Sequence, residues 1–431
     1  MGMKEQSLKI QTAVMTGCNM VIRGLGFILR MITARLLGPE AVGVMELAGQ
    51  AHMLALTPAA SGLPGAVSRM VAKDAEKAGV LLTARKMVMR LGLLLGVLLL
   101  LFSPLIAGWM GDERTLPSLL LFSPCILIIG LSGVYRGYSL GMGNVWPPAL
   151  CEMTEQVVRL LIVLAAALII PRLTVAWRAA VPAFATVMGE SCGLLLMVLW
   201  LRKKVKGRPA PVGKQLSRAA LPVTMNRLCH TALRTLCSVI IPLRLTAAGL
   251  SHSEAISRMG MLNGMVMPLI FLPGMFSGAL GTVSIPAVAG CRSCVRQRKL
   301  MLRLLLAAGA VGIGCSSLLH VLAPFVGKKL YALPEVGELL RAMSPLAAIL
   351  SVQQVLGGIM MGLGMERKTF FASLWGALIT LGLTFLWTAD RRLGIYGAGY
   401  ANLVGHGITL VCCLISFLMH EKTAESTASA V

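Results

Sequence analysis

Five arginines lie inside long uncharged stretches of this sequence, where a positive charge demands an explanation. In chain order they are Arg23, Arg30, Arg159, Arg227 and Arg234. The first two are seven residues apart, as are the last two, so each of these pairs shares one face of a helix. At the centre of a bilayer an arginine costs at least ~2.5–3.5 kcal/mol unless it faces water or a partner.

The chemistry that such arginines offer is the binding of an anion. At 1.5 Å per helical residue, Arg23 and Arg227 lie roughly 20 Å and roughly 17 Å from the predicted cytoplasmic ends of their helices, which is near mid-membrane. The planar guanidinium suits phosphate and pyrophosphate groups. We therefore predict a cationic cavity for an anionic substrate, which also includes Arg30 and Arg234.

Neutral polar residues accompany these arginines on the same helices, namely Asn19, Asn226 and His230. They could bond to a sugar or to another helix, and the sequence leaves both possibilities open. The arginines have structural alternatives as well. Arg30 and Arg234 could reach the outer interface. The possible ion-pair partners of the buried arginines are Glu46, Glu152, Glu155 and Glu190.

A second group of polar residues consists of Glu152, Glu155, Gln156 and Arg159. The last three follow Glu152 by three, four and seven residues. This spacing places them on one helix face, which cannot face lipid. Arg136, in the preceding apolar stretch, completes the predicted polar network. The network is either a packing element or part of a gate that re-pairs during a conformational change.

The elements that must position these residues are membrane helices. Of the 431 residues, 56% are hydrophobic and only 13% are charged, about half the usual charge of a soluble domain, which is about 25%. A bilayer-spanning helix needs about 20 apolar residues. The composition excludes a soluble, a disordered or a single-anchor protein and predicts an all-α polytopic membrane protein.

We predict twelve transmembrane helices from the apolar stretches. Their ranges are 10–34, 41–66, 88–110, 116–139, 146–171, 177–201, 215–243, 255–288, 300–326, 337–363, 369–389 and 395–419.

The excess of basic residues follows this topology. The net charge is +23, and most of the basic loop residues lie in loops on one side of the predicted helices. Cytoplasmic loops accumulate Lys and Arg, so we place both termini in the cytoplasm and expect no nucleic-acid partner.

The chain also has the pattern of a duplication. Gly62, Gly65, Val67 and Ser68 recur 216 residues later, and the glycines of 137–143 recur 221 residues later. We predict an N-terminal six-helix lobe (1–202), a basic cytoplasmic linker (203–214) and a C-terminal six-helix lobe with a short polar tail (215–431). An even number of spans per lobe gives a parallel repeat, with a central cavity between the lobes.

Catalytic and cofactor motifs are absent from the sequence. It contains no P-loop, no nucleophile elbow, no H-E-x-x-H and no G-x-G-x-x-G. Cys291 and Cys294 have no second pair and no nearby histidine, which argues against a zinc site. We expect no catalytic residues, no metal, no cofactor and no enzyme activity.

Four segments resemble the stage V sporulation protein B group: residues 35–43 (RLLGPEAVG), 62–69 (GLPGAVSR), 135–138 (YRGY) and 155–159 (EQVVR). That group belongs to the polysaccharide and oligosaccharide-lipid branch of the multidrug/oligosaccharidyl-lipid/polysaccharide exporter superfamily. The resemblance implies two six-helix lobes around a central cavity. It also implies outward flipping of polyprenyl-pyrophosphate-linked sugars in the cytoplasmic membrane of a spore-forming bacterium.

Three functions follow as hypotheses. The first is a flippase for a lipid-linked cell-wall saccharide that works by alternating access among membrane lipids. The second is a cation-coupled multidrug exporter, against which stands the absence of Asp and Glu between Glu5 and Glu40. The third is a scaffold that recruits cell-wall synthases through its basic loops, chiefly 66–90 and 202–218.

Overall fold

The computed structural model describes residues 2–73, 77–201, 208–291 and 294–429, and within them the side chains of 17, 20–73, 77–201, 208–285, 287–291 and 296–420. The regular structure of these residues is helical throughout. The chain divides into two compact units, unit 1 (Met1–Thr235) and unit 2 (Leu236–Val431).

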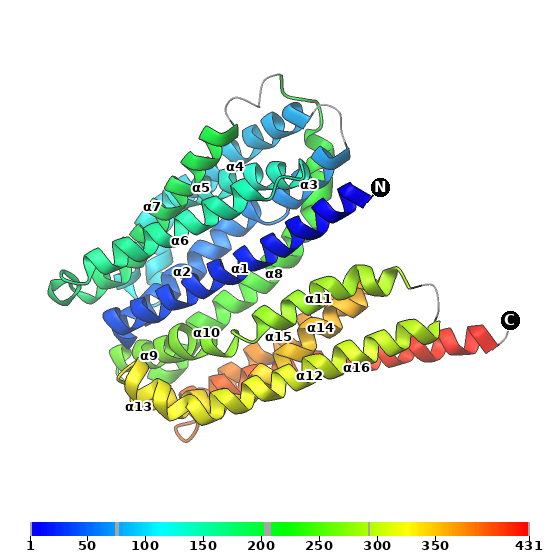
Figure 1. Ribbon diagram of the computed structural model, residues 1–431. Helices are drawn as coiled ribbons and strands as arrows, with labels where there is room; N and C mark the ends of the chain where they lie inside the picture. The colour runs from blue at the N-terminus through cyan, green and yellow to red at the C-terminus, as the bar shows by residue number, and fades with distance from the viewer. Residues whose placement is uncertain (1, 74–76, 202–207, 292–293, 430–431) are drawn as a thin grey trace. The chain divides into compact units, whose positions relative to one another are not determined.

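Unit 1 begins with the long helix α1 and ends inside α8 (Figure 1). Its helices are α1 (Gly2–Leu37), α2 (Pro39–Ala60), α3 (Leu63–Lys73), α4 (Lys77–Trp109), α5 (Leu116–Gly141), α6 (Trp146–Ala166), α7 (Val175–Leu201) and the first part of α8 (Gly213–Ala247). Gly38, at φ 79°, and Pro39 start α2, because glycine tolerates positive φ and proline suits the first helical turn.

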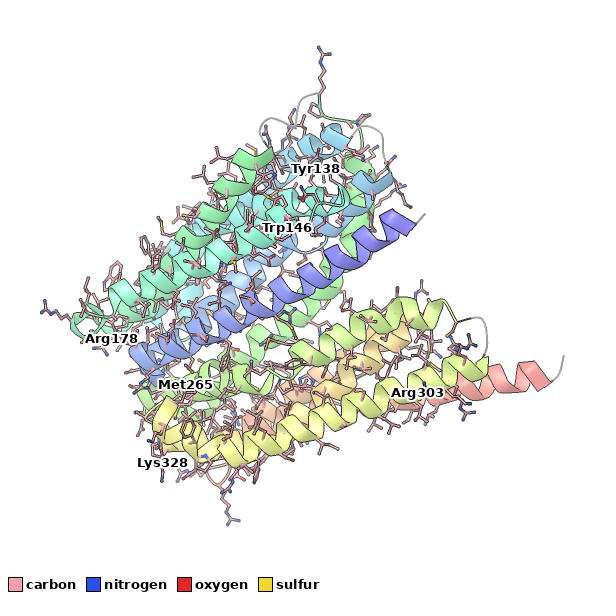
Figure 2. All side chains as sticks on the ribbon, in the orientation of Figure 1. Tyr138, Trp146, Arg178, Met265, Arg303 and Lys328 are labelled. Atoms are coloured by element: carbon pink, nitrogen blue, oxygen red, sulfur yellow. The ribbon has the colours of Figure 1, made fainter. Side chains whose placement is uncertain are left out.

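Unit 2 contains the end of α8 and the remaining helices. They are α9 (His252–Met259), α10 (Met267–Ile270), α11 (Gly274–Ala289), α12 (Cys294–Phe325), α13 (Pro334–Met343), α14 (Pro345–Gly362), α15 (Glu366–Trp387) and α16 (Ile395–Ser429). A π-helical segment, Gly260–Val266, joins α9 to α10. Figure 2 shows Arg303 and Lys328 near opposite ends of the stretch formed by α12 and the segment that follows it.

The predicted all-α membrane fold is confirmed. Among the described residues, eight helices are long and apolar enough to cross a membrane, or nine if a pair bent by 52° counts as one span. The bent pair corresponds to the predicted span 255–288, and it is interrupted between Ile270 and Gly274 around Pro273. The number twelve remains a prediction, because several helices are shorter or more polar than this criterion requires.

The duplicated glycines make equivalent contacts in the two units. A Cβ on Gly137 of α5 would lie 2.3 Å from the carbonyl oxygen of Pro64, and a Cβ on Gly358 of α14 would lie 2.2 Å from that of Gly281. No side chain fits at such distances, so each glycine allows the backbones of two helices to touch.

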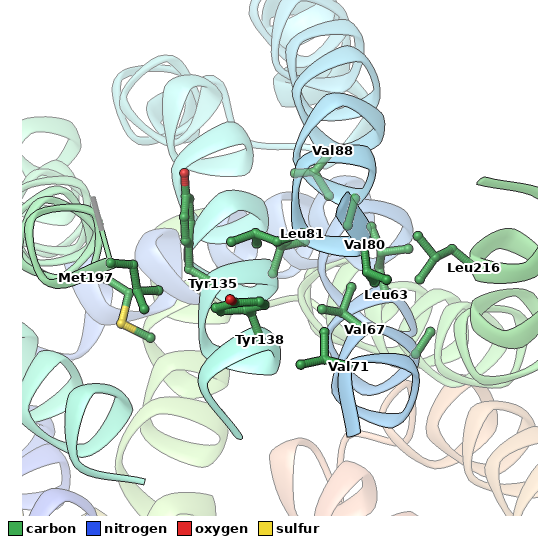
Figure 3. Close-up of a cluster of buried hydrophobic side chains, with 14 of the residues drawn as sticks. Leu63, Val67, Val71, Val80, Leu81, Val88, Tyr135, Tyr138, Met197 and Leu216 are labelled. Atoms are coloured by element: carbon green, nitrogen blue, oxygen red, sulfur yellow. The ribbon is translucent and has the colours of Figure 1, made fainter. Parts of the chain in front are cut away.

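Hydrophobic clusters hold the helices together within each unit. In unit 1, Leu63 and Val67 of α3 pack with Leu81 of α4 and Tyr138 of α5 (Figure 3). In unit 2, Val288, Met301, Ile359, Met365 and Phe417 bring α11, α12, α14, α16 and the start of α15 together. These clusters fix the registers in which the polar side chains meet.

The division between the compact units falls inside α8, and the two six-helix lobes with a linker at 203–214 stay a prediction. The physical reason for the division there is packing against unit 1. The amide of Ala210 donates to the Gly79 carbonyl at 3.2 Å, and Thr83 Oγ1 donates to the Ala210 carbonyl at 2.6 Å. A Cβ on Gly62 would lie 2.1 Å from the Ala220 carbonyl oxygen, so α8 touches the junction of α2 and α3.

Candidate functional site

Unit 1 contains all four arginines of the predicted cavity. Arg23 and Arg30 lie on α1, and Arg227 and Arg234 lie on the part of α8 that belongs to this unit. All four side chains are exposed. Arg30 forms an ion pair with Glu46 of α2, so the structural alternative applies to this residue.

Arg23 and Arg227 differ from Arg30 in their surroundings. Within the described part of the chain, neither of them forms an ion pair or a hydrogen bond through its guanidinium. Each therefore has donors that remain available to a ligand. At the predicted depth of both residues, a guanidinium without a partner costs free energy in the membrane. This cost favours a functional role for Arg23 and Arg227.

Two hydrogen bonds join α8 to α2. Thr57 Oγ1 of α2 donates to Thr231 Oγ1 at 3.5 Å, and Thr235 Oγ1 donates to the Gln50 carbonyl at 3.3 Å. Arg234 is the residue before Thr235, and Glu46 is one turn before Gln50 on α2. The structure thus brings the outer arginines of α1 and α8 toward the same stretch of α2.

The accompanying neutral residues are less well defined. The side chain of Asn19 lies outside the described residues. Asn226 is exposed and His230 is half-buried on α8. Their role at the arginines stays a prediction.

The charged residues of the second group of polar residues form one ion-pair network between α5, α6 and α7, and among the described contacts Gln156 is not part of it. Arg136 of α5 pairs with Glu155 and, through Nη1 at 3.1 Å, with Glu152 of α6. Its Nη2 atom also lies 3.7 Å from Glu190 Oε2 of α7. Arg159 Nη2 completes the network at 2.5 Å from Glu190 Oε1.

Two glycines of α7 make room for this network. A Cβ on Gly193 would lie 2.1 Å from Glu155 Oε1, and a Cβ on Gly189 would lie 2.9 Å from the Cγ atom of Arg159. Next to Glu155, Gln156 Oε1 of α6 lies 3.6 Å from the position of a Cβ on Gly26 of α1. The network is therefore held by α7 and is connected through α6 to the helix that carries Arg23.

Sequence reasoning placed Glu190 only among possible ion-pair partners, whereas it joins both arginines of the network. The sequence does point to this residue, because Glu190 is an acidic residue inside an apolar span, where a carboxylate costs free energy unless it has a partner. A second cluster has no counterpart among the residues singled out from the sequence. Arg114 contacts Asp112 at 2.8 Å and Glu40 at 2.6 Å, which ties the start of α2 to the loop before α5.

Unit 2 contains polar contacts between its helices. His406 Nδ1 of α16 lies 3.0 Å from Gln353 Oε1 of α14. A Cβ on Gly405 would lie 1.8 Å from Thr380 Oγ1, and a Cβ on Gly376 would lie 1.9 Å from Thr409 Oγ1. Helices α15 and α16 therefore pack through matching glycine and threonine positions.

No metal centre is found among the described residues: no group of three or more His, Cys, Asp or Glu side chains there is arranged to hold an ion. What the described groups of unit 1 offer chemically is binding. Arg23 and Arg227 can bind an anion, and the carboxylates of the network can bind a cation or a proton.

Comparisons with known proteins place the fold in context. Residues 9–291 match the family described as polysaccharide biosynthesis protein. The chain is 30% identical to stage V sporulation protein B of Bacillus subtilis (strain 168), with 94% of this chain and 82% of that protein covered.

Two solved structures show the same fold. An inward-facing multidrug resistance MATE family transporter of the MOP superfamily has a TM-score of 0.77 at 16% identity, covering 94% of this chain and 95% of that one. The lipid II flippase MurJ, in an inward closed conformation, has a TM-score of 0.74 at 14% identity, covering 94% and 87%. These two neighbours are a transporter and a flippase.

Proposed function

Because the chain belongs to the polysaccharide biosynthesis protein family and is a multi-pass membrane protein, we propose that it is a flippase for a polyprenyl-pyrophosphate-linked cell-wall saccharide. The substrate crosses the cytoplasmic membrane by alternating access. Arg23 and Arg227 hold the pyrophosphate while the sugar crosses, and Arg30 and Arg234 extend this path.

One observation carries the proposal: two arginines placed deep in predicted spans have no ion-pair partner among the described side chains. A guanidinium in that position is stabilised when a phosphate supplies the missing charge. Arg30, which already has Glu46, contributes less to binding in this scheme.

The test is transport by the purified protein in liposomes, using a fluorescent polyprenyl-pyrophosphate-linked disaccharide and a membrane-impermeant quencher. Arg23→Ala and Arg227→Ala should each lower the rate of flipping at least about tenfold, since a charge-assisted bond contributes roughly 1.5–3 kcal/mol. Arg90→Ala, at an exposed arginine of α4, is the matched control. Full activity of both cavity variants would refute the site.

A multidrug exporter is the second candidate, because multidrug transporters share the fold. The described side chains of α1 include three arginines, Arg23, Arg30 and Arg35, and no carboxylate, which suits an anion better than a cationic drug. Increased resistance of cells that express the protein to cationic drugs would favour the exporter over the flippase.

The cellular process that this transport serves is proposed from the similarity to a known protein. The relative in Bacillus subtilis is a sporulation protein, so we place the transport step in the synthesis of peptidoglycan during sporulation. Both termini lie in the cytoplasm in this proposal. Reporter domains fused to either end, active only on one side of the membrane, test that orientation.

A further inference from the structure

We propose that Glu155 and Glu190 of unit 1 form a proton-binding site and that one proton is bound and released in each transport cycle. This inference rests on the proposed function and names the ion that drives it. The site is the place where both carboxylates meet the guanidinium of Arg136, between α5, α6 and α7.

The charge of the network is unbalanced. It contains two arginines, Arg136 and Arg159, and three glutamates, Glu152, Glu155 and Glu190. With every group ionised, the network carries one excess negative charge, shared between the buried pair and the partly exposed Glu152. An uncompensated charge in such surroundings is expensive, and one proton removes it.

The geometry selects two of the three glutamates. Glu155 Oε1 and Glu190 Oε2 both lie within ion-pair distance of the same atom, Arg136 Nη2. Their side chains are 3% and 9% exposed, whereas that of Glu152 is 33% exposed. Two buried carboxylates that share one donor repel each other, so the pair favours holding one proton in common.

The surroundings leave this pair as the site of protonation. The charged and titratable groups that face the pair are Arg136 and Cys125 of α5 and Arg159, Glu152 and Cys151 of α6. Helix α1 presents Gly26 to Gln156 of α6, and the imidazole of α2, His52, is stacked on Phe122 of α5. The group in the described structure that can take up the excess charge is therefore a carboxylate.

The alternative is that the charged residues of the unit 1 network serve only to pack the helices. Unit 2 tests this alternative within the same chain. It repeats the glycine contact of unit 1 and packs its α15 and α16 through threonine and glycine. Its polar contact between Gln353 and His406 is neutral or singly charged. The described residues of unit 2 thus form the repeated architecture without a buried carboxylate network, which favours a role beyond packing for the network of unit 1.

Protonation has a mechanical consequence. A hydronium ion gives its proton to a carboxylate oxygen of the pair; when this oxygen belongs to Glu190, an O–H bond forms, the carboxylate loses its charge, and water is the other product. The attraction of Glu190 for Arg136 and Arg159 then weakens. Arg136 keeps its contacts with Glu152 and Glu155 of α6, while Arg159 of α6 loses its pair with α7 and α7 is released. Because Gln156 on α6 lies beside Gly26 on α1, the change reaches the helix that carries Arg23.

The experiment measures flipping and proton movement in the same liposomes, with the fluorescent lipid-linked disaccharide as substrate and a trapped pH dye. A gradient of one pH unit should change the final distribution of the disaccharide between leaflets about tenfold at one proton per cycle. Glu190→Gln and Glu155→Gln should each abolish this response. Glu335→Gln, at an exposed carboxylate of α13, should keep it.

The outcomes separate this inference from the proposed function. Flipping by the wild type that ignores the pH gradient and moves no protons overturns the proton site and leaves the flippase intact. If the wild type does not flip the substrate, the proposed flippase function is refuted. Titration of the purified protein then tests the proton site by itself. The wild type should bind one more proton than Glu190→Gln between pH 5 and 8, and equal uptake overturns the site. If Glu190→Gln fails to fold, Glu155→Gln replaces it in both measurements.

Discussion

Gly137 of α5 touches the Pro64 carbonyl in unit 1, and Gly358 of α14 touches the Gly281 carbonyl in unit 2. The two units therefore share a contact between backbones. Around that contact unit 1 has Arg136 paired with glutamates, whereas unit 2 has Gln353 beside His406. The comparison teaches that close backbone packing specifies this architecture, while the charges were free to diverge with function.

The largest expected effect comes from removing the cation of unit 1. Arg136→Met leaves Glu155 buried without its partner, which should lower the free energy of unfolding by about 3–5 kcal/mol. Thermal unfolding of the detergent-purified protein, followed by size-exclusion chromatography, measures the loss.

A combined variant is the control for this first prediction. Arg136→Met together with Glu155→Gln leaves the pair of Arg159 and Glu190 intact and should recover most of the stability while transport stays lost. An Arg136→Met protein as stable as the wild type would contradict the view that the network is buried and coupled.

The second prediction compares the shared contact directly. Gly137→Ala and Gly358→Ala each place a methyl group against a backbone carbonyl and should cost about 2 kcal/mol, because overpacking forces the helices apart. Gly108→Ala and Gly309→Ala are matched controls, since a Cβ at either site meets nothing within 4 Å. Those controls should be neutral or slightly stabilising. Unequal losses of stability for Gly137→Ala and Gly358→Ala would show that the two glycine contacts are not equivalent.

Much of this fold is predictable from sequence because bilayer crossing leaves a strong signal. The predicted span 177–201 corresponds to α7, Val175–Leu201. The errors occur at breaks. The predicted span 41–66 is divided at Ser61 and Gly62, and 337–363 is divided before Pro345. Apolar composition continues through such breaks, so hydropathy alone cannot locate them.

The site was predictable only in part, for a different reason. Spacing on one helix placed Glu152, Glu155 and Arg159 on a common face, but pairing depends on which helix lies opposite. Glu190 is 31 residues from Arg159, and their contact arises from the packing of α6 on α7. A single sequence contains no direct record of that packing.

The third prediction concerns the neutral interior of unit 2. Gln353→Leu removes the contact with His406 and should cost about 1 kcal/mol, the net contribution of an ordinary hydrogen bond. Flipping per folded molecule should not change, because the contact is structural in this view. The measurement normalises transport to the folded protein in each liposome preparation. A large loss of transport at full stability would show that unit 2 also contains a functional polar site.

The smallest effect is expected at the start of α9 in unit 2. Ser251 and Glu254 form a capping box, in which the Ser251 hydroxyl accepts from the Glu254 amide. Ser251→Ala should cost about 1 kcal/mol, and Ser251→Asp should keep the cap and the stability. In unit 1 the cap before α5, Asp112, is also bound by Arg114, so Asp112→Ala should cost more. Equal losses of stability at the two caps would show that the ion pair of Arg114 with Asp112 adds nothing to the cap. The ion pairs of unit 1 would then be expected to affect transport rather than stability.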